Sequence, residues 1–145
     1  MEDCPFCRFV RGDAPVHAVL ESDRALAFLD NHPAAEYHTL VVPKRHATNV
    51  FDVPEADWLA VTALVKRVVD LYRDRLGVEH AEVVHCAGAE AQQEVFHLHV
   101  HVLPRHAEDG QDTDWTRYPA IEERLGLLIE RLRPEAARGG NSGAD

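Results

Sequence analysis

The stretch Val95-Phe96-His97-Leu98-His99-Val100-His101-Val102-Leu103-Pro104 decides the fold of this 145-residue chain. Histidines alternate with apolar residues, which predicts a β-strand over Val95–Leu103 whose successive side chains point to opposite faces. Val95 and the three histidines then share one face, whereas Phe96, Leu98, Val100 and Val102 point into an apolar core. Three imidazoles in a row are an odd way to build a core, because each ring carries two nitrogens that need hydrogen-bond partners.

Three interpretations of this histidine run stay open from its spacing alone. All three rings can hold one metal ion, since imidazole nitrogen is a common metal ligand. They can instead act in catalysis, because an imidazole attacks phosphorus when one nitrogen is unprotonated and the other is held by an acceptor. A neighbouring imidazole on the same face can then donate to a phosphate oxygen. The third interpretation is a partly exposed strand that carries histidines by chance.

The segments on either side predict an α+β domain. Short strands are expected over 16–20, 25–30, 38–43 and 82–86. Apolar residues recur at helical spacing from Leu64 to Leu76, which predicts a long helix that is capped by Asp52 and stopped by Gly77. A second helix is expected over Pro119–Arg133. This order of elements is typical of an antiparallel sheet that is covered by helices.

Composition and charge restrict the class of protein and its partners. A length of 145 residues and an ordinary composition, 46% hydrophobic and 28% charged, predict a single domain, expected over 1–134. The small polar stretch 139–143 predicts a disordered tail over 135–145. The net charge of -10 argues against a nucleic-acid backbone or an anionic membrane as the main partner, though not against a small anionic substrate. Neither a long apolar run nor a signal peptide is found, so a cytoplasmic location is predicted.

Two of the three cysteines, Cys4 and Cys7, form a C-x-x-C motif. In a cytosolic chain such a pair indicates metal or redox chemistry, not a disulfide framework. A redox role is disfavoured because no thioredoxin-like βαβ pattern surrounds the motif. The third cysteine, Cys86, is expected to be a small buried side chain at the end of a strand.

These segments together resemble the histidine triad (HIT) family of nucleotide hydrolases and transferases. The run 97–103 fits all seven positions of the family pattern His-φ-His-φ-His-φ-φ, where φ is hydrophobic, and Pro104-Arg105 continues the match. The segments 25–30 and 38–46 look like the family's first conserved block, and 4–7 looks like its N-terminal segment. The resemblance implies the HIT fold, a curved antiparallel sheet of about five strands with two helices, in a homodimer.

The resemblance also implies an activity, namely cleavage at the α-phosphate of a purine nucleotide derivative through a covalent nucleotidyl-His99 intermediate. The substrate would be a phosphoramidate or a dinucleoside polyphosphate. By position, His101 should hydrogen-bond the α-phosphate and His38 should orient the site. The expected nucleotide-binding residues are Phe6, Phe9, Phe28, Asp30, Asn31, Gln93 and His101. Two alternatives stay open: a nucleotidyl transferase with the same intermediate, and a nucleotide- or zinc-binding module with little turnover.

A structural zinc site is a further implication of the resemblance. Some family members bind zinc through an N-terminal cysteine pair, the histidine after Pro-Lys-Arg, and the first histidine of the triad. The corresponding residues here are Cys4, Cys7, His46 and His97. A site with four protein ligands leaves no position for substrate, so its expected role is to hold the N-terminal segment against the triad strand.

The loop before the triad departs from the family pattern. Ala87 and Gln92 replace asparagine and glycine, and Glu94 replaces a small or hydroxyl residue that can donate a hydrogen bond near the phosphate or leaving group. An ionised carboxylate only accepts hydrogen bonds and repels a phosphate unless it turns away. Glu36 is expected to add a second negative charge near the same region. The preferred leaving group is therefore open at this point.

Overall fold

The computed structural model describes residues 3–112 and 114–133. These residues fall into two compact units, Met1–Asp109 and Gly110–Asp145, each of which is described by itself. The elements of the first unit are α1 (Pro5–Arg11), β1 (Ala18–Glu21), β2 (Ala25–Leu29), β3 (Thr39–Pro43), α2 (Glu55–Leu76), β4 (His80–Val84), the 3-10 turn η1 (Ala89–Ala91) and β5 (Val100–Arg105). The tail expected over 135–145 lies outside the described residues.

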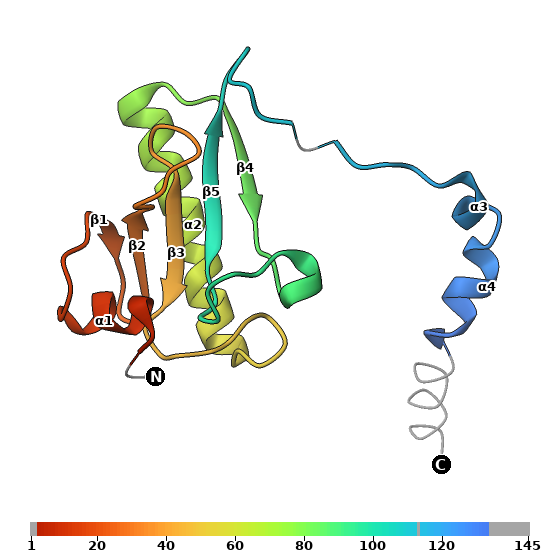
Figure 1. The fold of residues 1–145 in the computed structure, drawn as a ribbon, viewed down its shortest axis with the longest axis horizontal. Coiled ribbons are helices and arrows are strands. Elements are labelled where there is room, and N and C mark those ends of the chain that lie inside the picture. Colours follow the sequence, from red (N-terminus) through yellow and green to blue (C-terminus); the bar gives the residue numbers. More distant parts are fainter. Residues whose placement is uncertain (1–2, 113, 134–145) are drawn as a thin grey trace. The chain divides into compact units, whose positions relative to one another are not determined.

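A five-stranded antiparallel sheet with the order β1-β2-β3-β5-β4 forms the centre of the first unit (Figure 1). The predicted α+β class with an antiparallel sheet is therefore confirmed. Cross-strand pairing places Phe28, Leu40 and His101 in one row across β2, β3 and β5. This row brings an aromatic side chain from the first half of the chain to the same face as the last histidine of the triad.

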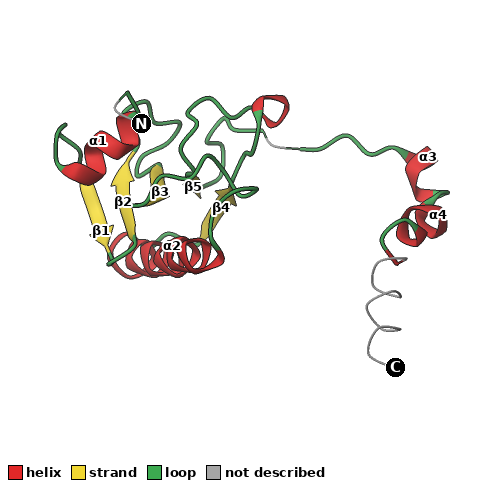
Figure 2. Cartoon of the chain, turned by 90° about the horizontal axis from the view of Figure 1, so that it is seen from below, coloured by secondary structure: helices red, strands yellow, loops and turns green. Residues whose placement is uncertain are grey.

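The two faces of the sheet are covered by different helices, α2 below and α1 above in Figure 2. The α2 layer buries Val61, Leu64 and Val68 against Ala25 and Val41 of the central strands, and Leu98, Val100 and Val102 complete this core. The α1 layer is smaller and packs Phe6 against Phe28, Leu40 and Val42. Strands β2 and β3 are thus buried on both faces. The triad histidines lie on the α1 side of the sheet, where Phe6 contacts the rings of His97 and His99.

The strand expected over Val95–Leu103 begins only at Val100. Residues 95–97 bend away from the ladder, and imidazole N–H groups take up the backbone carbonyls of His97 and His99. His99 Nδ1 lies 2.8 Å from the oxygen of His97, and His85 Nδ1 lies 3.0 Å from the oxygen of His99. The alternation holds for Leu98, Val100 and Val102, which enter the α2 core, but it is wrong for Phe96, which is 51% exposed.

Two expectations about helices need correction, and one helix was not predicted. Asp52 does not cap α2; it accepts hydrogen bonds from the N–H groups of Thr48 and Asn49 in the preceding turn. The helix expected over Pro119–Arg133 is divided into α3 (Pro119–Glu122) and α4 (Leu125–Glu130), which bury none of their residues and so lack the packing that sustains a long helix. Helix α1, begun by Pro5 and ended by Gly12 in the left-handed conformation, is too short to show a hydrophobic period.

Among the described residues, no helix is both long and apolar enough to cross a bilayer.

Candidate functional site

A cavity of about 550 Å³ opens on the α1 side of the sheet, beside the triad. This volume lies within the range of ligand pockets in proteins. All of the predicted catalytic residues and all but one of the predicted nucleotide-binding residues line it. The lining residues are Pro5, Phe6, Phe9, Phe28, Asp30, Asn31, His32, His38, Leu40, Cys86, Gln92, Glu94, Val95, His99 and His101.

One wall of this cavity is aromatic and rigid. The Phe6 and Phe28 rings lie 5.4 Å apart and the Phe9 and Phe28 rings 5.2 Å apart, both in edge-to-face arrangements. Phe6 also meets the ring of His99 edge-on at 5.3 Å. Beside this wall, Asp30 accepts a hydrogen bond from the His32 N–H at 2.9 Å, so its carboxylate faces the cavity in a defined position. An aromatic wall can pack against a flat base, and a neighbouring carboxylate can accept hydrogen bonds from ribose hydroxyls, so the arrangement suits a nucleoside.

The hydrogen bonds of His99 assign its tautomer. A backbone carbonyl can only accept, so the 2.8 Å contact with the oxygen of His97 places the proton on His99 Nδ1. Nε2 then carries a lone pair. No described residue forms a hydrogen bond with this atom. Since every buried side-chain nitrogen of the described residues has a partner, Nε2 is not buried, and a ligand in the cavity can reach it. Burial lowers the pKa of His99, which keeps the ring neutral at neutral pH.

A chain of hydrogen bonds likewise assigns the protons of His38 and His101. The N–H of Ala34 donates to His38 Nδ1 at 3.0 Å, so His38 carries its proton on Nε2. That Nε2–H lies 2.9 Å from His101 Nδ1 and donates to it, which leaves the His101 proton on Nε2. Burial lowers the pKa of His38, and burial together with the neighbouring histidines lowers that of His101 to about 4. The cavity therefore receives one lone pair, from His99, and one donor, from His101.

His85 supports this arrangement, although no motif in the sequence points to it. The N–H of Val50 donates to His85 Nε2 at 3.1 Å, so His85 Nδ1 donates to the oxygen of His99 at 3.0 Å. This bridge ties the loop before α2 to the backbone of His99. Because His85 follows β4 with no motif around it, only the tertiary structure could have revealed the contact.

Gln93 is the predicted nucleotide-binding residue that does not line the cavity. It is buried, and its oxygen accepts from Asn49 Nδ2 and the Gly88 N–H while its amide nitrogen donates to the oxygens of Thr48 and Val95. These four bonds use both ends of the amide. In this structure Gln93 therefore holds the loop before the triad instead of offering a donor to a phosphate.

We expect Gln93→Leu to lower the free energy of unfolding by about 2 to 4 kcal/mol, because it leaves buried donors and acceptors without partners. Urea unfolding measures this change. Glu90→Ala, at an exposed position of the same loop, serves as the control. A loss below about 0.5 kcal/mol, the range of ordinary surface substitutions, would count against the bracing role of Gln93.

The second predicted cluster, Cys4, Cys7, His46 and His97, is brought together although its members are far apart in sequence. One ligand atom from each residue lies within 4.8 Å of all the others. His97 Nδ1 lies 3.3 Å from Cys4 Sγ, 3.4 Å from Cys7 Sγ and 3.1 Å from His46 Nδ1. Cys7 Sγ lies 3.3 Å from His46 Nδ1. The four atoms thus surround one point beneath α1.

This geometry fits a tetrahedral zinc ion. Zinc–nitrogen and zinc–sulfur bonds of ordinary length separate neighbouring ligand atoms by about 3.3 to 3.8 Å, close to the distances found here. His97 Nε2–H donates to the oxygen of Pro43 at 2.9 Å, which frees Nδ1 as a ligand and fixes the ring as metal sites require. Burial and the neighbouring Cys4 raise the pKa of Cys7, and a positive charge among the four residues would favour its thiolate form.

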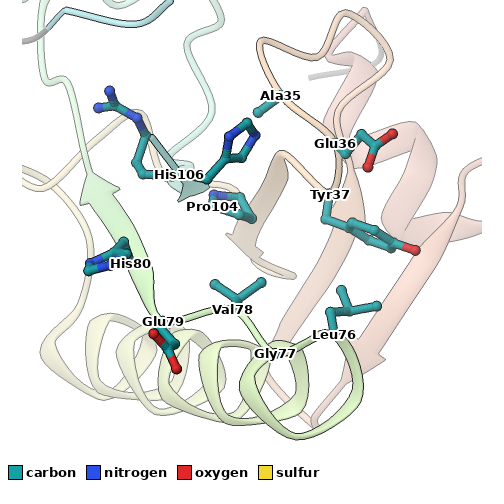
Figure 3. Close-up of a pocket in the computed structure, with 11 residues that line it drawn as sticks. Ala35, Glu36, Tyr37, Leu76, Gly77, Val78, Glu79, His80, Pro104 and His106 are labelled. Carbon is teal, nitrogen blue, oxygen red and sulfur yellow. The ribbon is translucent and has the colours of Figure 1, made fainter. Parts of the chain in front are cut away.

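A second cavity, of about 510 Å³, lies between the end of α2, the start of β4 and the loop before β3 (Figure 3). Glu36 lines this second cavity and not the one beside the triad, contrary to the expectation that it adds charge there. None of the predicted catalytic, nucleotide-binding or metal-binding residues reaches it. Its comparable size does not make it the candidate site, because none of the three triad histidines lines it.

The cavity beside the triad is also lined by Glu94, which was expected near the phosphate or leaving group, and by Cys86 and Gln92, which were not expected there. Cys86 is half-buried at the cavity wall, where a small apolar side chain was expected in the core. All three come from the connection between β4 and β5, the same loop that departs from the family pattern. The departures from the family pattern were the sequence feature that pointed to this loop. A change of charge in a loop next to the triad also changes which ligands the cavity can bind.

Comparison with known proteins finds similar sequences and the same fold. A model of the HIT domain matches residues 11–108. An adenosine 5'-monophosphoramidase of Schizosaccharomyces pombe is 34% identical over 130 residues, which cover 89% of this chain and 95% of that protein.

Two crystal structures extend the comparison to three dimensions. A protein from Streptococcus mutans superposes with a TM-score of 0.86 at 33% identity, over 94% of this chain and 87% of that one. A zinc-bound histidine triad family protein from Mycobacterium smegmatis superposes with a TM-score of 0.73 at 31% identity, over 94% of this chain and 98% of that one.

Proposed function

The chain belongs to the histidine triad (HIT) family, and on this premise we propose that it is a nucleotide hydrolase. It acts at the α-phosphate of a purine nucleotide derivative through a covalent nucleotidyl-His99 intermediate. The observation that carries this proposal is the pairing of one lone pair with one donor: His99 is held with Nε2 unprotonated, and His101 is held with Nε2–H. The S. pombe monophosphoramidase supports an adenosine 5'-phosphoramidate as the first substrate to test.

In the first step, His99 Nε2 attacks the α-phosphorus. The bond between phosphorus and the leaving group breaks, and the leaving atom keeps the electron pair and takes a proton. The leaving atom takes this proton from solvent, because each nitrogen of the neutral His38–His101 pair already serves as a single donor or acceptor. The carbonyl of His97 accepts from Nδ1–H and so stabilises the positive charge that develops on the His99 ring.

In the second step, water attacks the same phosphorus. The His99 Nε2–phosphorus bond breaks, and a nucleoside 5'-monophosphate leaves. The proton lost by the water goes to solvent, and the His99 ring regains its neutral starting state with its proton on Nδ1. His101 Nε2–H donates to a non-bridging phosphate oxygen in both steps. The wall formed by Phe6, Phe9 and Phe28 holds the base, and Asp30 accepts from the ribose hydroxyls.

The same family membership supports a structural zinc ion held by Cys4, Cys7, His46 and His97. A zinc ion there would tie α1, which carries Phe6 and Phe9, to the backbone just before His99. It would supply no chemistry at phosphorus, because protein ligands fill its four positions. A homodimer and a cytoplasmic location stay predictions.

Turnover separates this proposal from its two alternatives. The protein is incubated with adenosine 5'-phosphoramidate, and AMP is measured by chromatography. Release of AMP with water as the acceptor supports the hydrolase, whereas transfer to an added nucleophile in preference to water supports the transferase. Binding of the nucleotide without adduct or product supports the binding module and overturns the proposal.

The pH dependence of kcat/KM follows from the lowered pKa of His99. Protonation of Nε2 removes the nucleophile, and burial shifts that protonation below the usual value of about 6.5. Activity should therefore persist as the pH falls through 6.5 and decline only at lower pH. A profile of kcat/KM from pH 4 to pH 9 measures this. An acid limb centred at or above about 6.5 would contradict a buried neutral nucleophile.

A further inference from the structure

We infer that the reaction cavity selects for the charge of the leaving group, and that Glu94 directs it toward nucleoside phosphoramidates whose leaving amine carries a second, cationic group. This inference rests on the proposed function and specifies its substrate. It chooses between the two substrate classes that family membership leaves open. The structural basis is the set of charged side chains that line the cavity and the place of Glu94 among them.

The cavity holds carboxylates and no permanent cation. Of its lining residues, Asp30 and Glu94 are acidic, and no lysine or arginine is present among the described residues that line it. The His38 and His101 rings do not compensate as cations, because each accepts a hydrogen bond at Nδ1 and so carries one proton only. A polyphosphate leaving group would bring several negative charges into this surrounding, whereas a phosphoramidate has its charge at the α-phosphate alone.

The topology places Glu94 on the leaving-group side. The aromatic wall and Asp30 come from α1 and from β2 with the residue after it, on one side of the triad strand. Cys86, Gln92 and Glu94 come from the β4–β5 connection, on the other side, since the strand order is β2-β3-β5-β4. A nucleotide whose base occupies the aromatic wall and whose α-phosphate meets His99 thus directs its leaving group toward Glu94.

The Glu94 carboxylate is available to a ligand. Its residue is exposed, and no described residue forms a hydrogen bond or an ion pair with it. Arg105 and Lys44, by contrast, are engaged with acidic partners elsewhere. An ammonium or guanidinium group on the departing amine can therefore pair with Glu94 while the phosphorus–nitrogen bond breaks, and an anionic group in the same place is repelled.

Three adenosine 5'-phosphoramidates of matched length test this inference, with leaving amines that differ only in the group at the far end. Propylamine has a neutral end, 1,3-diaminopropane a cationic end and β-alanine an anionic end. We expect kcat/KM to be about tenfold higher for the cationic than for the anionic substrate at low salt, with the neutral one between them. The ratio should decrease as ionic strength rises, because Glu94 is exposed.

Two variants assign the preference to its residue. Glu94→Gln keeps the shape of the side chain and removes its charge, so the ratio between cationic and anionic substrates should decrease to about twofold. Glu90→Gln removes a charge from the same loop at an exposed position that does not line the cavity, and it should keep the parent ratio. A ratio near one in the parent protein, or an equal ratio in parent and Glu94→Gln, would overturn the inference.

These outcomes differ from a failure of the proposed function. If the hydrolase proposal is wrong, none of the three substrates gives AMP, or His99→Ala releases it as fast as the parent. If only the inference about Glu94 is wrong, all three substrates turn over through His99, either with similar values of kcat/KM or with a ratio that Glu94→Gln leaves unchanged.

Discussion

His99→Ala lowers kcat for adenosine 5'-phosphoramidate by at least about 10³-fold, the largest effect expected of any substitution in this chain. Among the described imidazoles whose tautomer is assigned, that of His99 alone directs a lone pair into the cavity beside the triad. The variant lacks this lone pair. His101 does not take over, because its Nδ1 accepts from His38 and its Nε2 is protonated. Steady-state AMP release, measured with enzyme in large excess over any contaminant, gives the value.

The control is His17→Ala, which removes an exposed histidine outside the cavity and should turn over at the parent rate. Unfolding midpoints of His99→Ala and the parent show whether the fold is kept. Because the Phe6 ring packs against His99, a small loss of stability is expected, and His99→Asn provides a more conservative second variant. Turnover within about tenfold of the parent in both variants would exclude His99 as the nucleophile.

Cys7→Ser has the second-largest expected effect, on stability and metal content. The parent, purified without a tag or chelator, should contain about one zinc ion per chain, and the variant far less. Because metal binding contributes directly to folding free energy, the variant should lose more than about 3 kcal/mol of stability. Elemental analysis and urea unfolding with and without chelator measure the two quantities.

Cys86→Ser is the matched control, since Cys86 is the one other cysteine and lies outside the cluster. It should keep the zinc content and most of the stability of the parent. Chelation should destabilise the parent and Cys86→Ser alike and leave Cys7→Ser nearly unchanged. A parent without zinc, or equal zinc in the parent and Cys7→Ser, would contradict the metal site.

Local patterns in the sequence were sufficient for much of this fold and site. Gly77 ends α2 in the left-handed conformation, as expected, and the strands with β-branched runs form the centre of the sheet. The triad and the C-x-x-C motif are each recognisable from a few consecutive residues, and the family pattern connects them with distant segments. The residues grouped in this way do lie together in the structure. The long separation between Cys4 and His97 carries no signal of its own, so only the resemblance could join them.

The features that escaped prediction depend on contacts between distant segments. The strand starts at Val100 because His85 and the His99 ring bind the carbonyls before it, and alternation of residue types does not contain that information. Gln93 was expected to face the substrate. Its side chain is instead buried in the loop, where its amide forms hydrogen bonds with Gly88 and Thr48 that hold the loop in place. Helix α1 is stabilised by packing of Phe6 on the sheet and is too short to be recognised from periodicity.

The covalent intermediate is the most direct test of how this protein works. The enzyme is mixed with a small excess of adenosine 5'-phosphoramidate, quenched under conditions that preserve phosphorus–nitrogen bonds, and analysed by intact-protein mass spectrometry with peptide mapping. We predict a transient mass increase of one adenylyl group on the peptide that contains His99, which forms before AMP accumulates. AMP release at the full rate with no adduct at any time point, or with an adduct on another residue, would contradict nucleophilic attack by His99.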